Sequence, residues 1–137
     1  MSNNLIGFLG ASFVGKSHIV HSLSNKYNIP YKAYVTIGCQ ISKYENKNEN
    51  YSLCDIYPQY SYIKTAHRWI KNFSLHIFIC DATNLSSINA INDFYLEIKP
   101  INYAIFINKS DLVDDEKKGE YLQKVRSKFK NYISISF

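Results

Sequence analysis

An eight-residue loop motif constrains this chain more than any other feature of its sequence. Residues 10–17 read Gly-Ala-Ser-Phe-Val-Gly-Lys-Ser, which fits the pattern G-x-x-x-x-G-K-S. An apolar run, residues 5–9, precedes the motif, and a helical pattern that begins at Lys16 follows it. Glycines let such a loop wrap around a polyphosphate with its N–H groups pointing inward. The sequence therefore predicts a strand, a phosphate-binding loop and a helix, with a nucleoside triphosphate and Mg²⁺ as the expected ligands.

The lysine and the serine of the motif have distinct expected roles. Lys16 supplies positive charge toward the β and γ phosphates, and the Ser17 hydroxyl is a candidate Mg²⁺ ligand. A chance glycine-lysine turn is the alternative, but the strand-to-helix setting argues against it. The residues expected to contact phosphates are Ser12, Phe13, Val14, Gly15, Lys16, Ser17 and His18.

The composition indicates one globular domain over residues 1–137. Apolar residues make up 46% of the chain and charged residues 20%, which is typical of a folded chain rather than a disordered one. No stretch approaches the roughly 20 apolar residues that a membrane-spanning helix needs. The sequence also shows no basic segment before its first apolar run and no lipidation motif. We therefore expect a cytoplasmic protein without a lipid anchor.

The chain carries a formal charge of +5, which favours attraction to anions. Much of the positive excess lies between residues 117 and 130, where basic residues flank Leu122, Val125 and Phe129 at helical spacing. A solvated helix face is the main interpretation, and contact with nucleic acid or an acidic membrane is the less favoured one. The three cysteines lie in or beside apolar runs and form no C-x-x-C pair, so we interpret them as reduced core thiols.

Strand-like and helix-like patterns alternate along the chain. Apolar runs predict strands at residues 5–9, 33–42, 51–55, 75–81, 103–108 and 132–136. Apolar stripes at helical spacing predict helices at residues 16–26, 60–72, 87–99 and 116–130. The polar stretch 45–50 has no room for a helix, so the strands beside it should form an antiparallel hairpin. The predicted fold class is α/β, with six strands in a mostly parallel sheet, one antiparallel hairpin strand, and helices on both faces.

Three of the predicted strands end in a polar residue. Asp55, Asp81 and Asn108 close the strands 51–55, 75–81 and 103–108. The carboxyl ends of parallel strands meet at one edge of a sheet, and the phosphate loop follows such an end. We therefore expect these polar side chains to converge on the phosphate loop.

A second motif lies directly after the strand 103–108. Residues 108–111 read Asn-Lys-Ser-Asp, which fits N-K-x-D. A carboxylate at Asp111 can accept both N1–H and the exocyclic amine of guanine, a donor pair that adenine lacks, and the Lys109 stem can lie along the ring. A turn or helix cap at Asp111 is the structural alternative.

Together with the phosphate loop, this motif makes the chain resemble the Ras-like small GTPases, which have a P-loop NTPase fold called the G-domain. Within them it is most similar to the Rab group, through Thr-Ile-Gly at residues 36–38 and Cys-Asp-Ala-Thr-Asn at residues 80–84. The resemblance implies GTP or GDP with Mg²⁺ as ligands. It also implies protein effectors or regulators of the GEF or GAP type as partners.

The resemblance also implies roles for individual residues. Thr36 matches the switch threonine that ligates Mg²⁺ and contacts the γ phosphate, and Asp55 matches the aspartate of D-x-x-G that holds Mg²⁺ through water. Gln59 matches the glutamine that orients the attacking water, while Lys16 would stabilise developing charge. The last base-contacting motif of the family falls at residues 134–136 or 136–137, so Ser136 and Phe137 are candidate guanine contacts.

Three departures from the family pattern carry expectations of their own. Pro58 stands where D-x-x-G requires glycine, and proline has no backbone N–H, so we expect weaker discrimination between GTP and GDP. Ile29 stands where relatives place an aromatic residue over guanine, with Tyr27 or Tyr31 as possible substitutes. The sequence leaves no residues for the family's final helix, which predicts an exposed sheet surface suited to self-association or a partner protein.

Two functions follow from these observations. The first is a Rab-like small GTPase that binds guanine nucleotide and slowly hydrolyses GTP as a molecular switch. The second is a pseudo-GTPase, a binding module that engages effectors or regulators with little or no hydrolysis. Pro58, Ile29 and the missing helix favour the second, whereas the phosphate loop, Gln59 and N-K-x-D favour the first. A third interpretation treats the basic helix as a contact for RNA or anionic lipid.

Overall fold

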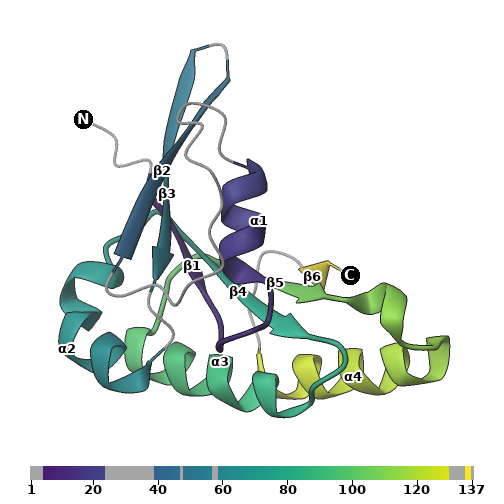
Figure 1. The fold of residues 1–137 in the computed structure, drawn as a ribbon. Helices are drawn as coiled ribbons and strands as arrows, with labels where there is room; N and C mark the ends of the chain where they lie inside the picture. The colour runs from purple at the N-terminus through teal and green to yellow at the C-terminus, as the bar shows by residue number, and fades with distance from the viewer. Residues whose placement is uncertain (1–4, 24–38, 47, 57–58, 130–134, 137) are drawn as a thin grey trace.

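The computed structural model describes residues 5–23, 39–46, 48–56, 59–129 and 135–136. Strands and helices alternate along these residues, as the sequence predicts (Figure 1). The strands are β1 (Leu5–Leu9), β2 (Cys39–Asn46), β3 (Glu49–Ile56), β4 (Leu75–Asp81), β5 (Tyr103–Asn108) and β6 (Ile135–Ser136). The helices are α1 (Lys16–Leu23), α2 (Tyr60–Ile70), α3 (Ser86–Ile98), the 3₁₀ turn η1 (Ser110–Leu112) and α4 (Asp115–Lys128). The predicted segments 16–26, 33–42, 116–130 and 132–136 each extend into residues outside the described part.

The strands form one mostly parallel sheet in the order β2-β3-β1-β4-β5-β6. β1 pairs in parallel with β3 on one side and with β4 on the other, and β5 and β6 continue the parallel arrangement. Only the pairing of β2 with β3 is antiparallel among these strands. The predicted α/β fold with a mostly parallel sheet and an antiparallel hairpin is therefore confirmed.

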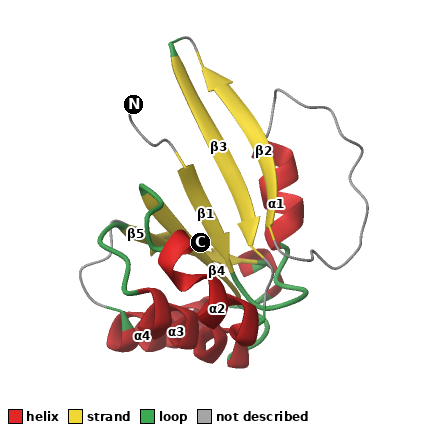
Figure 2. Ribbon diagram, turned by 90° about the vertical axis from the view of Figure 1, so that its left-hand side faces the viewer, coloured by secondary structure: helices red, strands yellow, loops and turns green. Residues whose placement is uncertain are grey.

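Two separate groups of apolar side chains cover the two faces of the sheet. On one face, Val20 of α1 packs with Phe8, Leu53 and Ile79 of the strands. On the other face, α2, α3 and α4 form a layer (Figures 1 and 2). The buried side chains of these helices pack against buried residues of the strands. Because successive side chains of a strand point to opposite faces, Ile105 and Ile107 join the second group while Phe106 joins the first. Self-association through the sheet stays a prediction.

An aromatic cluster links α3, α4 and the centre of the sheet. The rings of Tyr95 and Tyr103 lie 5.1 Å apart, and those of Tyr95 and Phe129 lie 5.5 Å apart. Phe78 contacts the same cluster, with its ring 5.8 Å from that of Tyr103. Aromatic pairs at these distances stabilise a core by about 0.5–1.5 kcal/mol each beyond the area that they bury.

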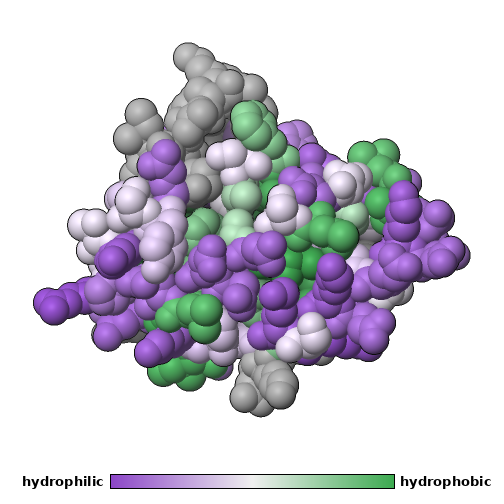
Figure 3. Space-filling view, turned by 90° about the horizontal axis from the view of Figure 1, so that it is seen from below, coloured by the Kyte–Doolittle hydropathy of each residue, from purple (hydrophilic) through white to green (hydrophobic). Residues whose placement is uncertain are grey.

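The basic stretch after residue 115 forms the exposed side of α4. Asp114 caps the helix by accepting a 2.8 Å hydrogen bond from the Lys117 main-chain N–H. Lys124 and Arg126 are exposed, whereas Val125 is buried. The face of the molecule seen from below is mostly hydrophilic, with scattered hydrophobic groups (Figure 3). The prediction of a solvated, basic helix face is therefore confirmed. In the described part of the chain, no helix combines the length and apolar character needed to cross a membrane.

The hairpin differs from its prediction. The polar stretch 45–50 was expected to be a connection, but pairing continues through Glu45 with Asn50 and Asn46 with Glu49. The hairpin projects beyond the rest of the sheet, so its outer end needs no apolar face (Figure 2). Main-chain hydrogen bonds form there whatever the side chains are. The hydrophobic pattern therefore underestimates how far both strands extend toward the turn, because β2 continues to Asn46 and β3 begins at Glu49.

His76 is a buried histidine in β4. It is 1% exposed, and its Nε2 lies 2.7 Å from the main-chain oxygen of Ile70, while its ring stacks on Phe73 at 5.8 Å. Burial lowers the pKa of the imidazole, and the hydrogen bond to Ile70 only partly opposes this effect. His76 is therefore neutral in the folded protein at neutral pH.

Because the pKa of His76 is lowered in the folded protein, we predict that protonation of this histidine in the unfolded chain lowers the free energy of unfolding at acid pH. Below pH ~6.5 the unfolded histidine takes up a proton while the folded one stays neutral, so stability falls by up to about 1.4 kcal/mol per pH unit. The loss stops once the pH is below the folded pKa. In urea titrations at pH 7.5 and pH 5, His76→Phe should lose less stability than the native chain. Equal losses in the two proteins would contradict the prediction.

Candidate functional site

The loop between β1 and α1 has a backbone that only glycine suits at two positions. A Cβ at Gly10 would lie 2.5 Å from the main-chain oxygen of Ile79, because β4 passes directly beside it. Gly15 has φ of +94°, and a Cβ there would lie 2.5 Å from the Asn108 side-chain nitrogen. Both glycines of the motif are therefore required by the packing of the loop against β4 and against the end of β5.

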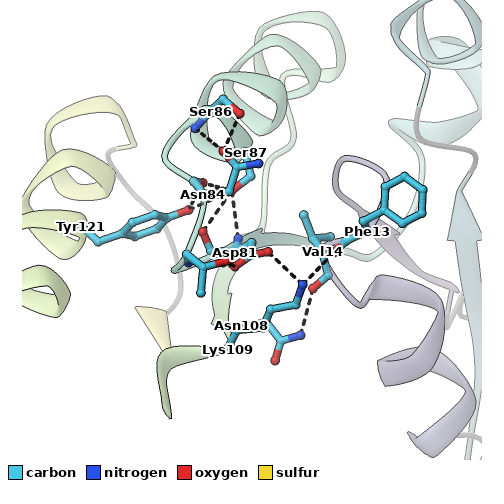
Figure 4. Close-up of polar contacts among 10 residues, drawn as sticks. Phe13, Val14, Asp81, Asn84, Ser86, Ser87, Asn108, Lys109 and Tyr121 are labelled. Atoms are coloured by element: carbon cyan, nitrogen blue, oxygen red, sulfur yellow. Dashed lines mark hydrogen bonds and ion pairs between the residues drawn. The ribbon is translucent and has the colours of Figure 1, made fainter. Parts of the chain in front are cut away.

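Phe13 also has a left-handed backbone conformation. Its φ is 68°, which is strained for a bulky residue. Its side chain is 89% exposed and so points away from the packed side of the loop. Its main-chain oxygen, in contrast, points toward the end of β5 and accepts a hydrogen bond there (Figure 4).

A buried ion pair joins the start of α1 to the end of β3. Lys16 is 4% exposed and Asp55 is 3% exposed, and the Lys16 ammonium donates to Asp55 Oδ1. Lys16 also donates to the main-chain oxygen of Ile56 at 2.8 Å. Burial lowers the pKa of Lys16, and the Asp55 carboxylate works against this decrease. The predicted phosphate-binding lysine and the predicted metal-binding aspartate thus lie side by side.

The Ser17 hydroxyl contacts the same carboxylate and donates to its Oδ2. A serine hydroxyl and an aspartate carboxylate offer only oxygen ligands, and Mg²⁺ prefers oxygen ligands and retains several waters. Ser17 and Asp55 therefore fit a Mg²⁺ ion at the edge of the phosphate loop. Thr36, the third predicted ligand, lies outside the described residues.

The second motif binds the first directly. Asn108 Nδ2 donates a 2.9 Å hydrogen bond to the main-chain oxygen of Val14. Lys109, which has φ of 61°, donates through Nζ to the main-chain oxygen of Phe13 at 2.9 Å. These contacts connect residues that are 94 and 96 positions apart in sequence. The N-K-x-D segment therefore supports the phosphate loop, and Asp111 stands exposed beside it in η1.

Asp81 is part of the same group, as expected from its position at the end of a strand, although no contact with a ligand was predicted for it. It ends β4 opposite Asn108 of β5, and its Oδ2 lies 2.9 Å from Lys109 Nζ (Figure 4). Burial alone would raise the pKa of Asp81, but hydrogen bonds from Thr83 and Lys109 outweigh it and hold the pKa below its ordinary value. Its position at the end of an apolar strand was the available signal in the sequence.

The comparisons with known proteins bear on the fold. No protein-family model matches the sequence, and no curated protein matches it. A bacterial selenocysteine-specific elongation factor, EF-Sec, has a similar structure, with a TM-score of 0.72 and 16% identity over 99% of this chain. The translation elongation factor SelB from Methanococcus maripaludis, in complex with the GTP analogue GppNHp, gives a TM-score of 0.68 and 16% identity over 99% of this chain. This chain has a P-loop GTPase fold.

The similarity concerns only part of each neighbour. This chain spans 26% of the EF-Sec chain and 30% of the SelB chain. At 16% identity the likeness shows the fold, and the resemblance to the Rab group stays a prediction.

Other predicted site residues lie at the edge of this group or outside the described part. Gln59 lies exposed at the residue before α2, with extended backbone. Ser12 and His18 are exposed on the loop and on α1. Ser136 lies in β6, where its main chain pairs with Phe106 of β5. The remaining predictions, which rest on Thr36, Pro58, Ile29, Tyr27, Tyr31 and Phe137, fall outside the described residues.

Proposed function

We propose that this chain binds GTP and GDP together with Mg²⁺, and that it hydrolyses GTP slowly as a molecular switch. The observation that carries the proposal is the direct contact between the two motifs. Asn108 and Lys109 bind the main-chain oxygens of Val14 and Phe13. A phosphate-binding loop and a guanine-selecting segment that are joined in this way can hold the two ends of one nucleotide.

The phosphate end of the nucleotide is assigned to the loop and to the start of α1. Main-chain N–H groups of residues 12–18 would surround the phosphates, and Lys16 would add its charge at the β and γ phosphates. Bound Mg²⁺ would neutralise phosphate charge while Ser17, Thr36 and, through water, Asp55 hold it. Asp55 and Lys16 are already in contact, so the metal ligand and the phosphate ligand share one buried position.

The base end is assigned to the N-K-x-D segment. Asp111 would accept N1–H and the exocyclic amine of guanine, and the Lys109 stem would lie along the ring. Ser136 and Phe137 are further candidate contacts after β5. A neighbour of this fold, SelB, was solved with a GTP analogue, which supports guanosine as the nucleoside. The finer proposal of a Rab-like GTPase rests on residues 36–38 and 80–84.

Binding is tested with the purified chain by calorimetry in the presence of Mg²⁺. We expect GDP and GTP to bind, and ADP and ATP to bind at least about 100-fold more weakly, because adenine cannot satisfy the Asp111 carboxylate. Mass spectrometry of copurified nucleotide gives a second readout. Equal affinity for adenosine and guanosine nucleotides would overturn the proposal.

Hydrolysis depends on Gln59 in this proposal. Unassisted enzymes of this class turn over at roughly 3–5 × 10⁻⁴ s⁻¹, and Gln59→Leu should lower the single-turnover rate about tenfold or more because the attacking water loses its hydrogen-bond partner. Gln123→Leu makes the same change on an exposed part of α4 and should leave the rate unchanged. If the native chain hydrolyses GTP no faster than the uncatalysed background and Gln59→Leu does not change that rate, the alternative function remains. That alternative is a pseudo-GTPase, a module that binds effectors or regulators.

A further inference from the structure

The ammonium group of Lys109 is held between two oxygens from different parts of the chain. One is Asp81 Oδ2 at 2.9 Å, and the other is the main-chain oxygen of Phe13 at 2.9 Å. The Lys109 side chain is 34% exposed, so its end is fixed while its stem remains partly accessible. A lysine held only by a loop carbonyl would keep more rotamer freedom than one that also bears an ion pair.

Asp81 is itself held firmly on the other side. Its Oδ1 accepts a 2.8 Å bond from the Thr83 main-chain N–H and a 2.6 Å bond from the Thr83 hydroxyl. The Asp81 main-chain N–H donates to Ser87 Oγ at 2.9 Å, and Ser87 Oγ lies 2.9 Å from the Tyr121 hydroxyl. The residue is 6% exposed. The carboxylate therefore has one fixed orientation, in which one oxygen stays on Thr83 and the other faces Lys109.

We infer that Asp81 is a positioning residue for the nucleotide base, which acts by holding Lys109 in the conformation that places its stem along the ring. This inference rests on the proposed function, because it presumes that guanine lies on Lys109. Asp81 does not touch the base itself. Asp81 restricts the rotamers of Lys109 before the nucleotide binds. The entropy that Lys109 would otherwise lose upon binding is therefore already lost in the free protein.

Asparagine at position 81 separates this role from the turn that Asp81 also stabilises. In Asp81→Asn the amide oxygen can still accept both bonds from Thr83, which preserves the turn at residues 81–84. The amide nitrogen then faces the Lys109 ammonium, so that a donor opposes a donor and the ion pair is lost. The variant therefore changes the contact with Lys109 while it leaves the local fold nearly intact.

The experiment is a double-mutant cycle on GDP affinity with Mg²⁺, measured by calorimetry. Asp81→Asn should weaken GDP binding about 5- to 10-fold, mainly through faster dissociation, because Lys109 loses its fixed position. In the Lys109→Met background the same change should have no further effect, since there is no ammonium to position. Asp115→Asn removes the carboxylate from an exposed pair with Lys118 (3.9 Å) and should leave GDP affinity unchanged.

Each outcome supports or overturns the inference. An equal loss from Asp81→Asn in both backgrounds, or no loss in either, overturns it while the proposed function stands. A native chain that binds no guanine nucleotide overturns both. If Asp81→Asn does not fold, Thr83→Ala is the replacement, because it removes one of the two bonds that Thr83 donates to the carboxylate without removing the carboxylate's charge. Its smaller loss should likewise disappear in the Lys109→Met background.

Discussion

Replacement of Lys16 with alanine is expected to weaken GTP and GDP binding by about 100-fold or more. The ammonium lies buried at the start of α1, where it would hydrogen bond to two phosphate groups of a bound nucleotide, and hydrogen bonds to charged groups are each worth about 1.5–3 kcal/mol. Calorimetry of the variant with each nucleotide and Mg²⁺ measures the loss. Lys118→Ala removes the same charge from α4 and should bind as the native chain does.

Lys16→Ala is also expected to lower the stability of the folded protein. Asp55 is 3% exposed, and without Lys16 its carboxylate keeps Ser17 but loses the ammonium. Removal of one partner of a buried ion pair typically destabilises a protein by about 3–5 kcal/mol. The thermal stability of the Lys16→Ala variant without nucleotide should therefore be measured alongside its nucleotide affinity. If Lys16→Ala does not fold, Ser17→Ala tests the same loop, and its GDP affinity should lose its dependence on Mg²⁺. Undiminished affinity in a folded Lys16→Ala would contradict the assigned role.

The fold was largely predictable because its strands and helices carry strong local patterns. The runs at 5–9, 75–81 and 103–108 match β1, β4 and β5 residue for residue, since buried parallel strands are nearly continuous apolar segments. The hairpin was predictable in kind but not in length. Its outer end pairs through main-chain groups, which leave no trace in side-chain hydrophobicity.

The candidate site was predictable where a motif specifies residue types at fixed spacing. Asp55, Asp81 and Asn108 were predicted to converge with the phosphate loop on one edge of the sheet, and the structure places them there. The partners of these residues were less predictable. The ion pair between Asp81 and Lys109 depends on the register of β4 and β5 and on a left-handed residue at 109, and a sequence alone specifies neither.

Residues that act through others were the hardest to find in the sequence. Ser87 and Tyr121 are 34 positions apart, and their hydroxyl groups meet only because α4 packs beside α3. The Tyr121 ring lies in the apolar core, where a hydroxyl needs a partner, and Ser87 supplies it. Such contacts support the turn that carries Asp81. They follow from the packing of the layer of helices rather than from any motif.

Asp111→Asn is expected to reverse the base preference of the chain. Guanine presents two donors, N1–H and the exocyclic amine, to the two oxygens of the exposed Asp111 carboxylate. An asparagine keeps one acceptor but turns a donor toward the second guanine donor. Loss of one charged hydrogen bond and the clash between donors should weaken GDP binding by about 100-fold or more.

The prediction for Asp111→Asn also names a nucleotide that the variant should prefer, xanthosine diphosphate. Xanthine keeps N1–H but carries an oxygen in place of the exocyclic amine, so it offers one donor and one acceptor and matches the asparagine amide. Asp111→Asn should therefore bind xanthosine diphosphate more tightly than GDP, whereas the native chain should show the opposite order. Asp114→Asn is the matched control, because Asp114 caps α4 and asparagine caps helices equally well. If Asp111→Asn lost affinity for both nucleotides alike, Asp111 would be a structural residue of η1 rather than the group that selects guanine.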